Sequence, residues 1–555
     1  MIRNLLVSVG LLLMGTAAFG QVLVSYKTKS ALISKAVSSL VENLSETGFS
    51  SSNLPIVVIN TDNGAVIIDD PKITAHMGII DNGPGNRNTI SDAYTNYNGT
   101  IGIELRGNST QDFPKKPYNF ETRDNIGANL DVSLLGLPKE NDWVLSASYV
   151  DHTFIRNPLA SHLSQLTGRW ASHCLMVEVV LNGNYQGIYI LMESIKRDKN
   201  RLNIAKLDPA EITSPDITGG YIWEVTGFEN NMGYARNLKY PKYDEAAPAQ
   251  RNYIIKYDNN FRSVMNSTTY KDETTGYSAW IDVPSFVDEL IVQEATRNSD
   301  AYGWSSYFHK DMNQKINAGP VWDFDQSAGN SSYPDDGVAE GWMFKHQGTM
   351  NTPFFWKLLF DDPVFSYKVK LRWTELRKEL YKTDNINIYI DSIANYLSEA
   401  QSREFAKWPV LGKYVWRETS GFQKRTTYKS EVEYLKGFLK KRFDWMDTEL
   451  AKIQNPNPHT SIIQQFENGE TLHVYPNPAA DYLVFEISSK KPGKAIIQMY
   501  NYAGKLVQSS ASLKLNNNIT TYKFQFDPNL KQGFYLYKIV MDDRLLYAGK
   551  VIKRD

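Results

Sequence analysis

The segment Gly319–Asp325, which reads GPVWDFD, contains two carboxylates, Asp323 and Asp325, separated by one residue. If Val321–Asp325 is the end of a strand, Asp323 and Asp325 lie on one face and the aromatic residues on the other. Such a pair can share a hard divalent cation, because Mg²⁺ is typically held by one or two carboxylates and by phosphate oxygens of a substrate. The turn-forming residues that follow leave a second interpretation open, in which the aspartates cap backbone groups.

A second pair of polar residues follows an expected helix. Ser285–Arg297 carries apolar residues at helical spacing, and Asn298 and Asp300 come directly after it. In a phosphoryl-transfer site Asp300 could accept the proton of a substrate hydroxyl, and Asn298 could help to hold the metal ion. The same residue types also end helices, so a structural role remains an alternative.

Basic residues near the start of a strand are candidates for contacting phosphate. Lys115 and Lys116 lead into a strand close to the loop Arg106–Thr110, where a lysine could neutralise nucleotide phosphates. Glu193 follows another strand and could pair with the lysine or border a nucleotide pocket. Solvated lysines and an exposed glutamate are the alternatives. The chain contains no Walker A loop, protein-kinase glycine loop or dinucleotide fingerprint.

The elements that must position these residues are mainly strands first and helices later. Strands are expected at Val57–Asn60, Ile101–Arg106, Tyr118–Thr122, Trp143–Leu145, Val177–Leu181, Gly187–Met192, Ser306–His309 and Ala318–Trp322. Helices are expected at Phe154–Leu166, Ser285–Arg297, Val364–Leu380 and Tyr428–Leu450. Asn182-Gly183 predicts a tight hairpin turn between two of the strands. This order predicts an α+β fold for one large domain, residues 54–454.

Composition excludes several classes of protein. The chain has 555 residues, enough for several domains, and a formal net charge of -1, which gives no support for binding nucleic acid. Its single cysteine, Cys174, lies in an apolar run, so no intramolecular disulfide and no cysteine zinc site can form. Histidines do not cluster and no GxSxG motif occurs, which argues against metalloproteases and serine hydrolases. A glycosidase with paired carboxylates stays open.

The two ends of the chain have a different character from the middle. Residues 1–20 have a positive start, a short apolar run and small residues at the cleavage positions, which predicts a signal peptide. An arm of undecided structure covers residues 21–53, and no later stretch is long and apolar enough for a transmembrane segment. A linker at 455–472 precedes short alternating strands, which predict a small β-sandwich at 473–555.

This C-terminal segment resembles the type A sorting domain of the type IX secretion system. The matching residues are Tyr475–Pro478, Tyr500–Val507, Gly533–Tyr537 and Gly549–Lys553. The resemblance implies an interaction with the type IX secretion machinery, export across the outer membrane to a secreted or cell-surface location, and usually removal of the domain. A carbohydrate-binding or adhesion sandwich is the alternative.

The large domain resembles the CotH kinase family, the spore-coat protein H family of atypical protein kinases. The matching segments include Leu105–Ser109, Lys115–Tyr118, Asp142–Leu145, Phe154–Asn157, Val177–Val179, Leu181–Gly183, Gly219–Ile222 and Ala318–Asp325, with Glu193, Asn298 and Asp300. The family implies a diverged protein-kinase-like α+β fold that uses ATP and Mg²⁺, with Mn²⁺ as a second option. The implied reaction is phosphorylation of Ser or Thr in a protein substrate or in the chain itself.

Roles for individual residues follow from the resemblance by position. Asp300 takes the catalytic role, and Asp323 and Asp325 take the metal-binding role. Lys116, or in second place Lys115, contacts the phosphates. Glu193 and Asn298 are also assigned to the cofactor. Arg106 and Arg156 could give further donors to phosphate oxygens. Since a fold does not fix a function, a non-catalytic cell-surface or adhesion protein on a kinase-like fold is the second hypothesis.

Overall fold

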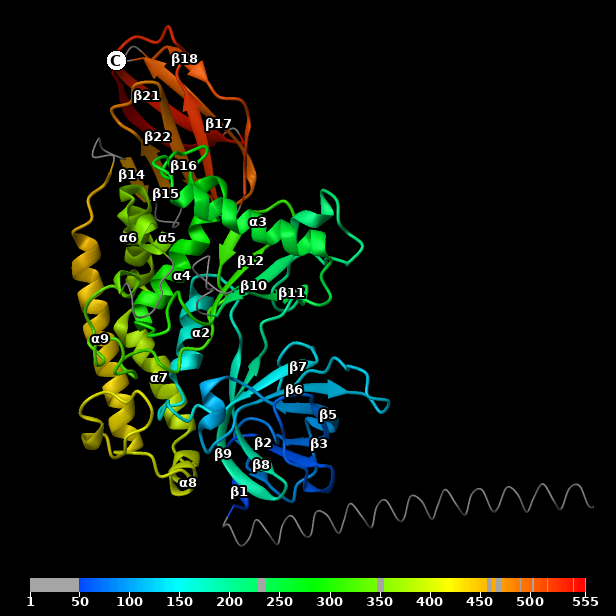
Figure 1. Ribbon diagram of the computed structural model, residues 1–555. Helices are drawn as coiled ribbons and strands as arrows, with labels where there is room; N and C mark the ends of the chain where they lie inside the picture. The colour runs from blue at the N-terminus through cyan, green and yellow to red at the C-terminus, as the bar shows by residue number, and fades with distance from the viewer. Residues whose placement is uncertain are drawn as a thin grey trace, which may run out of the picture. The chain divides into compact units, whose positions relative to one another are not determined.

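The computed structural model describes residues 49–226, 236–346, 354–456, 462–465, 471–489, 491–501, 504–516, 518–542 and 544–554 (Figure 1). The predicted signal peptide and residues 21–48 of the predicted arm lie outside the described residues. The chain divides into two compact units, with the boundary between Ala451 and Lys452. Each unit is described by itself below.

The larger unit begins with a closed barrel of seven strands. Around the barrel the strands are β2 (Ile56–Thr61), β3 (Ile73–Ile80), β5 (Tyr97–Leu105), β6 (Tyr118–Arg123), β7 (Asp142–Ser146), β9 (Asn184–Glu193) and β8 (Cys174–Leu181). All neighbours are antiparallel except β2 and β8, whose parallel pairing closes the barrel. Two short strands, β1 (Ser51–Ser52) and β4 (Asn88–Thr89), pair with each other.

The barrel interior is a packed core. Side chains alternate along each strand, so one set points inward, as in β6, where Tyr118, Phe120 and Thr122 are buried and the residues between them are partly exposed. The inward set joins Val57, Ile101 and the fully buried Trp143 in one hydrophobic cluster. Filling by large side chains of this kind is what a small barrel needs in order to close without a channel.

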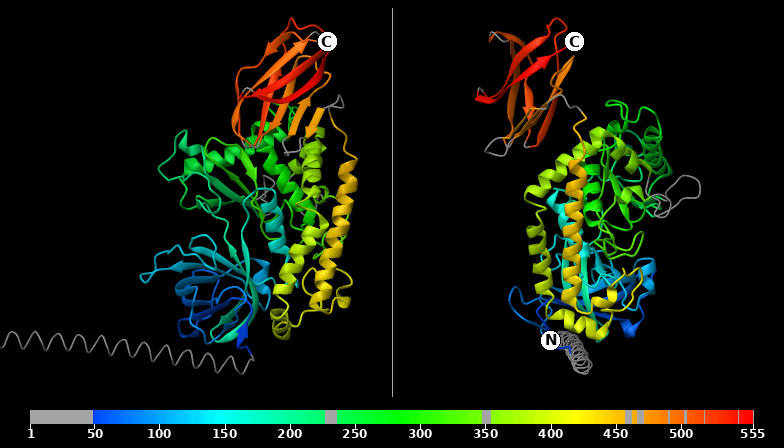
Figure 2. Two further views of the ribbon diagram at one scale, coloured as in Figure 1. Left: turned by 180° about the vertical axis from the view of Figure 1, so that it is seen from behind. Right: turned by 90° about the vertical axis from the view of Figure 1, so that its left-hand side faces the viewer.

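The rest of the unit combines a second sheet with helices. The sheet has the order β11 (Arg236–Tyr240), β10 (Tyr221–Val225), β12 (Ser306–Lys310) and β13 (Ile316–Ala318), all antiparallel. The helices are α2 (Arg156–Leu166), α3 (Pro248–Met265), α4 (Val283–Thr296), α5 (Phe354–Asp361), α6 (Pro363–Lys378), α7 (Thr383–Tyr396), α8 (Ala400–Lys407) and α9 (Tyr428–Ala451). Figure 2 shows α9 running along the helical part of the unit, and nearly every residue of α4 is buried within it.

The mixed α and β composition is confirmed, whereas the closed barrel was not predicted. The strand expected at Ala318–Trp322 is wrong, because β13 ends at Ala318 and the following residues are irregular. Gly319 adopts a φ of 92°, and Pro320 has no N–H to donate to a neighbouring strand, so the ladder cannot continue. Asp323 has a φ of 66°, so the alternation expected for Asp323 and Asp325 does not apply.

The smaller unit is a β-sandwich. One sheet has the order β14 (Ile462–Gln465), β15 (Thr471–Tyr475), β16 (Tyr482–Ser488) and β20 (Ile519–Gln525). The other has the order β18 (Leu506–Ser509), β17 (Gly493–Asn501), β21 (Gly533–Met541) and β22 (Arg544–Lys553), with β19 (Leu513–Leu515) paired to β17. Leu472 and Phe485 of the first sheet share a hydrophobic core with Ile497 and Tyr537 of the second. In the described part of the chain, no helix combines the length and the apolar character needed to span a bilayer.

Candidate functional site

A small pocket lies where barrel residues meet the loop that follows β13. Its walls include Arg106, Phe113 and Lys115 from the chain between β5 and β6, Tyr149 from the segment after β7, and Asp323 and Asp325 from the loop. The pocket has a volume of about 30 Å³. A volume of this size has room for an ion or about two water molecules, and not for a nucleotide.

Two side chains from other elements fix the backbone and the carboxylate at Asp323. Ser305, which precedes β12, donates its Oγ–H to Asp323 Oδ2 at 3.1 Å. Phe324, the residue after Asp323, donates its backbone N–H to Oδ1 of Asn157 in α2 at 2.6 Å, and the ring of Phe324 is buried. These contacts stabilise Asp323 in its left-handed conformation, which is less favourable for a residue with a Cβ atom than for glycine.

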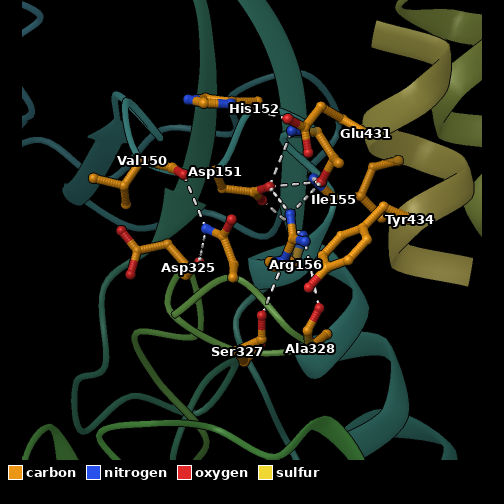
Figure 3. A network of polar contacts seen from close by, with 12 residues as sticks. Val150, Asp151, His152, Ile155, Arg156, Asp325, Ser327, Ala328, Glu431 and Tyr434 are labelled. Atoms are coloured by element: carbon orange, nitrogen blue, oxygen red, sulfur yellow. Dashed lines mark hydrogen bonds and ion pairs between the residues drawn. The ribbon is translucent and has the colours of Figure 1, made fainter. Parts of the chain in front are cut away.

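The backbone around Asp325 is fastened to the segment before α2 and to the start of α2 (Figure 3). Asn330 donates its amide to the carbonyl of Asp325 at 2.7 Å and to that of Val150 at 2.9 Å. Arg156, at the start of α2, donates Nε–H to the carbonyl of Ser327 at 2.9 Å and Nη1–H to Asp151 Oδ1 at 2.6 Å. Because the side chain of Arg156 is fully buried in these contacts, the expectation that it contacts phosphate is wrong.

Asp300 lies next to Asp323 and is held by an arginine from a distant segment. Arg417 donates Nη1–H to Asp300 Oδ1 at 3.2 Å. The guanidinium of Arg417 lies 4.2 Å from the ring centroid of Trp416 and 5.2 Å from that of Tyr333. Burial, and then the charge of Asp323, raise the pKa of Asp300, while Arg417 acts in the opposite direction. Asp300 and Asp323 are therefore electrostatic neighbours.

The two carboxylates in the pocket and Asp300 form a negative site. The pKa of Asp325 is well above its usual value, first because of burial and then because of the charges of Asp323, Asp300 and Asp151. A bound cation would relieve this repulsion, so the donor set fits a hard divalent ion. Among the described residues, no three His, Cys, Asp or Glu side chains are arranged to hold a metal ion by themselves. Phosphate oxygens and water would have to complete the coordination of an ion at Asp323 and Asp325.

Of the two candidate lysines, only Lys115 reaches the pocket. Its side chain is buried, and Nζ donates to Glu404 Oε1 of α8 at 2.7 Å and to the carbonyl of Ile188 at 2.6 Å. Burial lowers the pKa of Lys115, and the charge of Glu404 opposes this effect. Lys116 instead donates Nζ–H to the carbonyl of Gln111 at 2.5 Å, within the loop before β6.

The other predicted binding residues lie in different surroundings. Arg106 lines the pocket, with its guanidinium 5.4 Å from the ring centroid of Trp322. Asn298 is buried, and its side chain bonds to Gln293 at 3.1 Å and to the backbone N–H of Asp300 at 3.2 Å, so it shapes the loop rather than facing the pocket.

Glu193 lies outside the pocket. Its Oε2 accepts hydrogen bonds from the backbone N–H of His173 at 3.0 Å and from the Nδ1 of the same residue at 2.7 Å, and its Oε1 lies 3.9 Å from Nε of Arg201. The partner of the buried lysine is thus Glu404 and not Glu193.

The sequence did not predict the roles of four residues that shape this site, Asn157, Ser305, Glu404 and Arg417. Asn157 belongs to the matching segment Phe154–Asn157, but its contact with the Asp323 loop was not expected, and Ser305 lies directly before a predicted strand. Glu404 and Arg417 come from the helical end of the unit, and only the folded structure brings them to the barrel and to Asp300.

Comparison with protein families gives two matches that together cover most of the chain. Residues 103–446 match the model described as CotH kinase protein. Residues 473–554 match the model described as secretion system C-terminal sorting domain. No curated protein matches this chain.

Two solved structures give partial alignments. Dimeric latent PorU from Porphyromonas gingivalis aligns at 22% identity over 15% of this chain and 9% of its own, with a TM-score of 0.14. The Pseudomonas fluorescens alkylpurine DNA glycosylase AlkC, bound to DNA with an abasic site analog, aligns at 8% identity over 36% of this chain and 66% of its own, with a TM-score of 0.11. At these scores neither alignment bears on fold or function.

Proposed function

Because the chain belongs to the CotH kinase protein family and carries a C-terminal sorting domain for export to the cell surface, we propose that its larger unit is an exported atypical protein kinase. The proposed reaction transfers the γ-phosphoryl group of ATP to Ser or Thr hydroxyls of a protein substrate or of the chain itself. In this proposal the barrel and the helical part are the two lobes of a diverged kinase-like fold, and the pocket at Asp323 is the phosphate end of the cleft.

The observation that carries the proposal is the meeting of three acidic side chains beside a pocket lined by Arg106 and Lys115. Asp323 and Asp325 would hold Mg²⁺, or Mn²⁺, which when bound neutralises charge on the phosphates. Asp300, next to Asp323, is placed to accept the proton of the acceptor hydroxyl. Its bond to Arg417 fixes the direction in which the carboxylate points before substrate arrives.

Basic residues complete the proposed site. Arg106 can turn a planar donor group toward phosphate oxygens, because its guanidinium lies on the ring face of Trp322 and has no ion pair with any of the described residues. Lys115 supports the site through its charge and through the pair with Glu404, which ties the barrel to α8. The proposal therefore takes the positive charge beside the phosphates from Lys115, whereas the family resemblance assigns the phosphate contact in first place to Lys116.

Transfer of radiolabel from γ-labelled ATP in the presence of Mg²⁺ tests the proposal. We expect the full chain to label itself or an added protein, and Asp300→Ala and Asp323→Ala to lower the rate at least 100-fold, in line with the loss of a general base or a metal ligand. Asp444→Ala, which removes an exposed acid on α9, is the control and should keep the wild-type rate. A wild-type chain that neither binds Mg-ATP nor transfers label would contradict the proposal.

A non-catalytic surface or adhesion protein is the second candidate, and one observation favours it. The pocket is small, at about 30 Å³, and both Lys115 and Asp300 already have partners within the chain. Calorimetry with Mg-ATP separates the two candidates, because the adhesion protein should give no heat of nucleotide binding and should instead be retained on immobilised glycans or matrix proteins.

A further inference from the structure

Another pocket lies between β11, the outer strand of the second sheet, and α3 (Figure 1). It has a volume of about 220 Å³, and its walls include Trp223, Arg236, Tyr243, Arg251, Ile254 and Asp258. None of its lining residues lines the pocket at Asp323. It is therefore a separate site from the one to which phosphotransfer is assigned.

The pocket has a buried apolar part and an exposed apolar part. Trp223 and Ile254 are buried, and the ring of Trp223 stacks on that of Phe308 with the centroids 5.8 Å apart. Tyr243 and Ile255 also line the pocket, and both are large apolar side chains that remain exposed. Exposed apolar groups beside a concave, buried apolar surface are typical of a ligand site.

The charges that line the pocket leave one cation without an acidic partner. Asp258 is buried, and its Oδ2 lies 2.5 Å from Nε of Arg236 and 2.8 Å from Nε of Arg262. Arg251 forms no ion pair within the described part of the chain, and its only side-chain acceptors there are carbonyl oxygens. Since the one acid of the pocket is already shared by two arginines, the charge of the pocket favours an anion.

Arg251 is held so that one edge of its guanidinium group remains available. Nη1 donates to the carbonyl of Tyr243 at 2.8 Å and to that of Ala246 at 2.7 Å, and the guanidinium carbon lies 4.7 Å from the ring centroid of Tyr243. Nε and Nη2 are left, and two such parallel N–H groups bind a carboxylate in a bidentate manner. The buried N–H of Trp223 has no acceptor among the described residues either, so a ligand oxygen could satisfy it.

We propose that this pocket binds an apolar carboxylate, whose anionic group pairs with Nε and Nη2 of Arg251 while its apolar body lies against Ile254 and Trp223. The volume is below the range for drug-sized ligands, so it fits a small acid or the last residue of a peptide, which share this chemistry. The site does not depend on the proposed phosphotransfer function.

Calorimetric titration of the full chain with sodium phenylacetate, against sodium chloride at equal ionic strength and neutral pH, tests the proposal. We expect saturable binding of phenylacetate. Phenylacetamide keeps the ring without the charge and should bind about tenfold more weakly or worse, and acetate, which lacks the ring, should give no saturable binding. N-acetylglycylphenylalanine distinguishes the two sources, because tighter binding than phenylacetate assigns the site to a peptide terminus and weaker binding to a free acid.

Arg251→Gln should weaken phenylacetate binding about tenfold or more, and Arg251→Lys, which restores the charge, should recover part of the loss. A melting curve checks folding, because Arg251 also bonds to two carbonyls. Ile255→Asp leaves these bonds intact and should also weaken binding, since it adds a negative charge at the exposed part of the pocket. Lys256→Gln, which removes an exposed cation of α3 outside the pocket, is the matched control and should bind like wild type.

Three results would each overturn the proposal. The first is a wild-type chain without saturable binding of phenylacetate or of the peptide. The second is an amide that binds as tightly as the acid. The third is wild-type affinity in both Arg251→Gln and Ile255→Asp.

Discussion

Lys115 is a buried cation whose charge is balanced by a residue 289 positions later in the chain, Glu404. Removing one partner of such a pair leaves the other charge buried without compensation, which typically costs 3–5 kcal/mol. We therefore expect Lys115→Met to lower the free energy of unfolding by about 3–5 kcal/mol. Urea denaturation followed by tryptophan fluorescence measures this change.

The double variant Lys115→Met with Glu404→Gln is the control for that experiment. Gln at position 404 carries no charge and can still accept the hydrogen bond that the backbone N–H of Ile188 donates to the native carboxylate at 2.7 Å. The double variant should therefore recover at least half of the loss. Equal instability of the single and double variants would show that packing around the lysine, and not its charge, matters most.

At the level of residues, the sequence predicts chemistry best where the residues lie in one short segment. A single residue separates Asp323 from Asp325, and both line one pocket, although the strand that was expected to place them on one face is absent. Arg417 could not be predicted, because its contact with Asp300 depends on how the segment between α8 and α9 packs. The sequence also could not decide which of Lys115 and Lys116 lines the pocket, because Lys115 is buried by its contact with Glu404 of α8.

The helix α4 positions the loop of Asp300, and its start is stabilised by a side-chain cap. Asp282 accepts a hydrogen bond from the backbone N–H of Ser285 at 2.8 Å. Removing an N-cap side chain costs about 1 kcal/mol, so Asp282→Ala should lower the free energy of unfolding by about that amount. Asp282→Asn keeps a capping oxygen, so it should lower the free energy of unfolding by less than half as much, as measured by urea denaturation. An equal loss in both variants would show that the ion pair of Asp282 with Arg169 contributes more than the cap.

Elements with a strong local pattern are predictable from the sequence. The hairpin of β8 and β9 follows from its turn, where Asn182 and Gly183 adopt φ values of 48° and 76°, a conformation that suits these two residue types. The parallel pairing of β2 with β8, which closes the barrel, has no local signal because more than a hundred residues separate the two strands. Local patterns therefore predict six of the seven barrel strands, all except β3, and they do not predict the closed barrel.

On the scale of the whole molecule, the two units have separate hydrophobic cores. Trp143 and its neighbours fill the barrel of the larger unit, and Phe485 and its neighbours fill the sandwich. The change in composition along the chain predicts this division, since a linker rich in Asn and Pro stands between a helical and a strand-rich segment. A sorting domain that folds around its own core can be attached to a large unit without changing that unit's fold.

Separate cores lead us to expect two unfolding transitions in differential scanning calorimetry of the full chain. Phe485 is fully buried in the sandwich, so Phe485→Ala should cost about 3–5 kcal/mol and lower the temperature of one transition by several degrees. The other transition should keep its temperature, and a chain that ends at Asn455 should show that transition alone. If Phe485→Ala shifts both transitions together, the units unfold as one cooperative body and the sorting domain contributes to the stability of the proposed kinase.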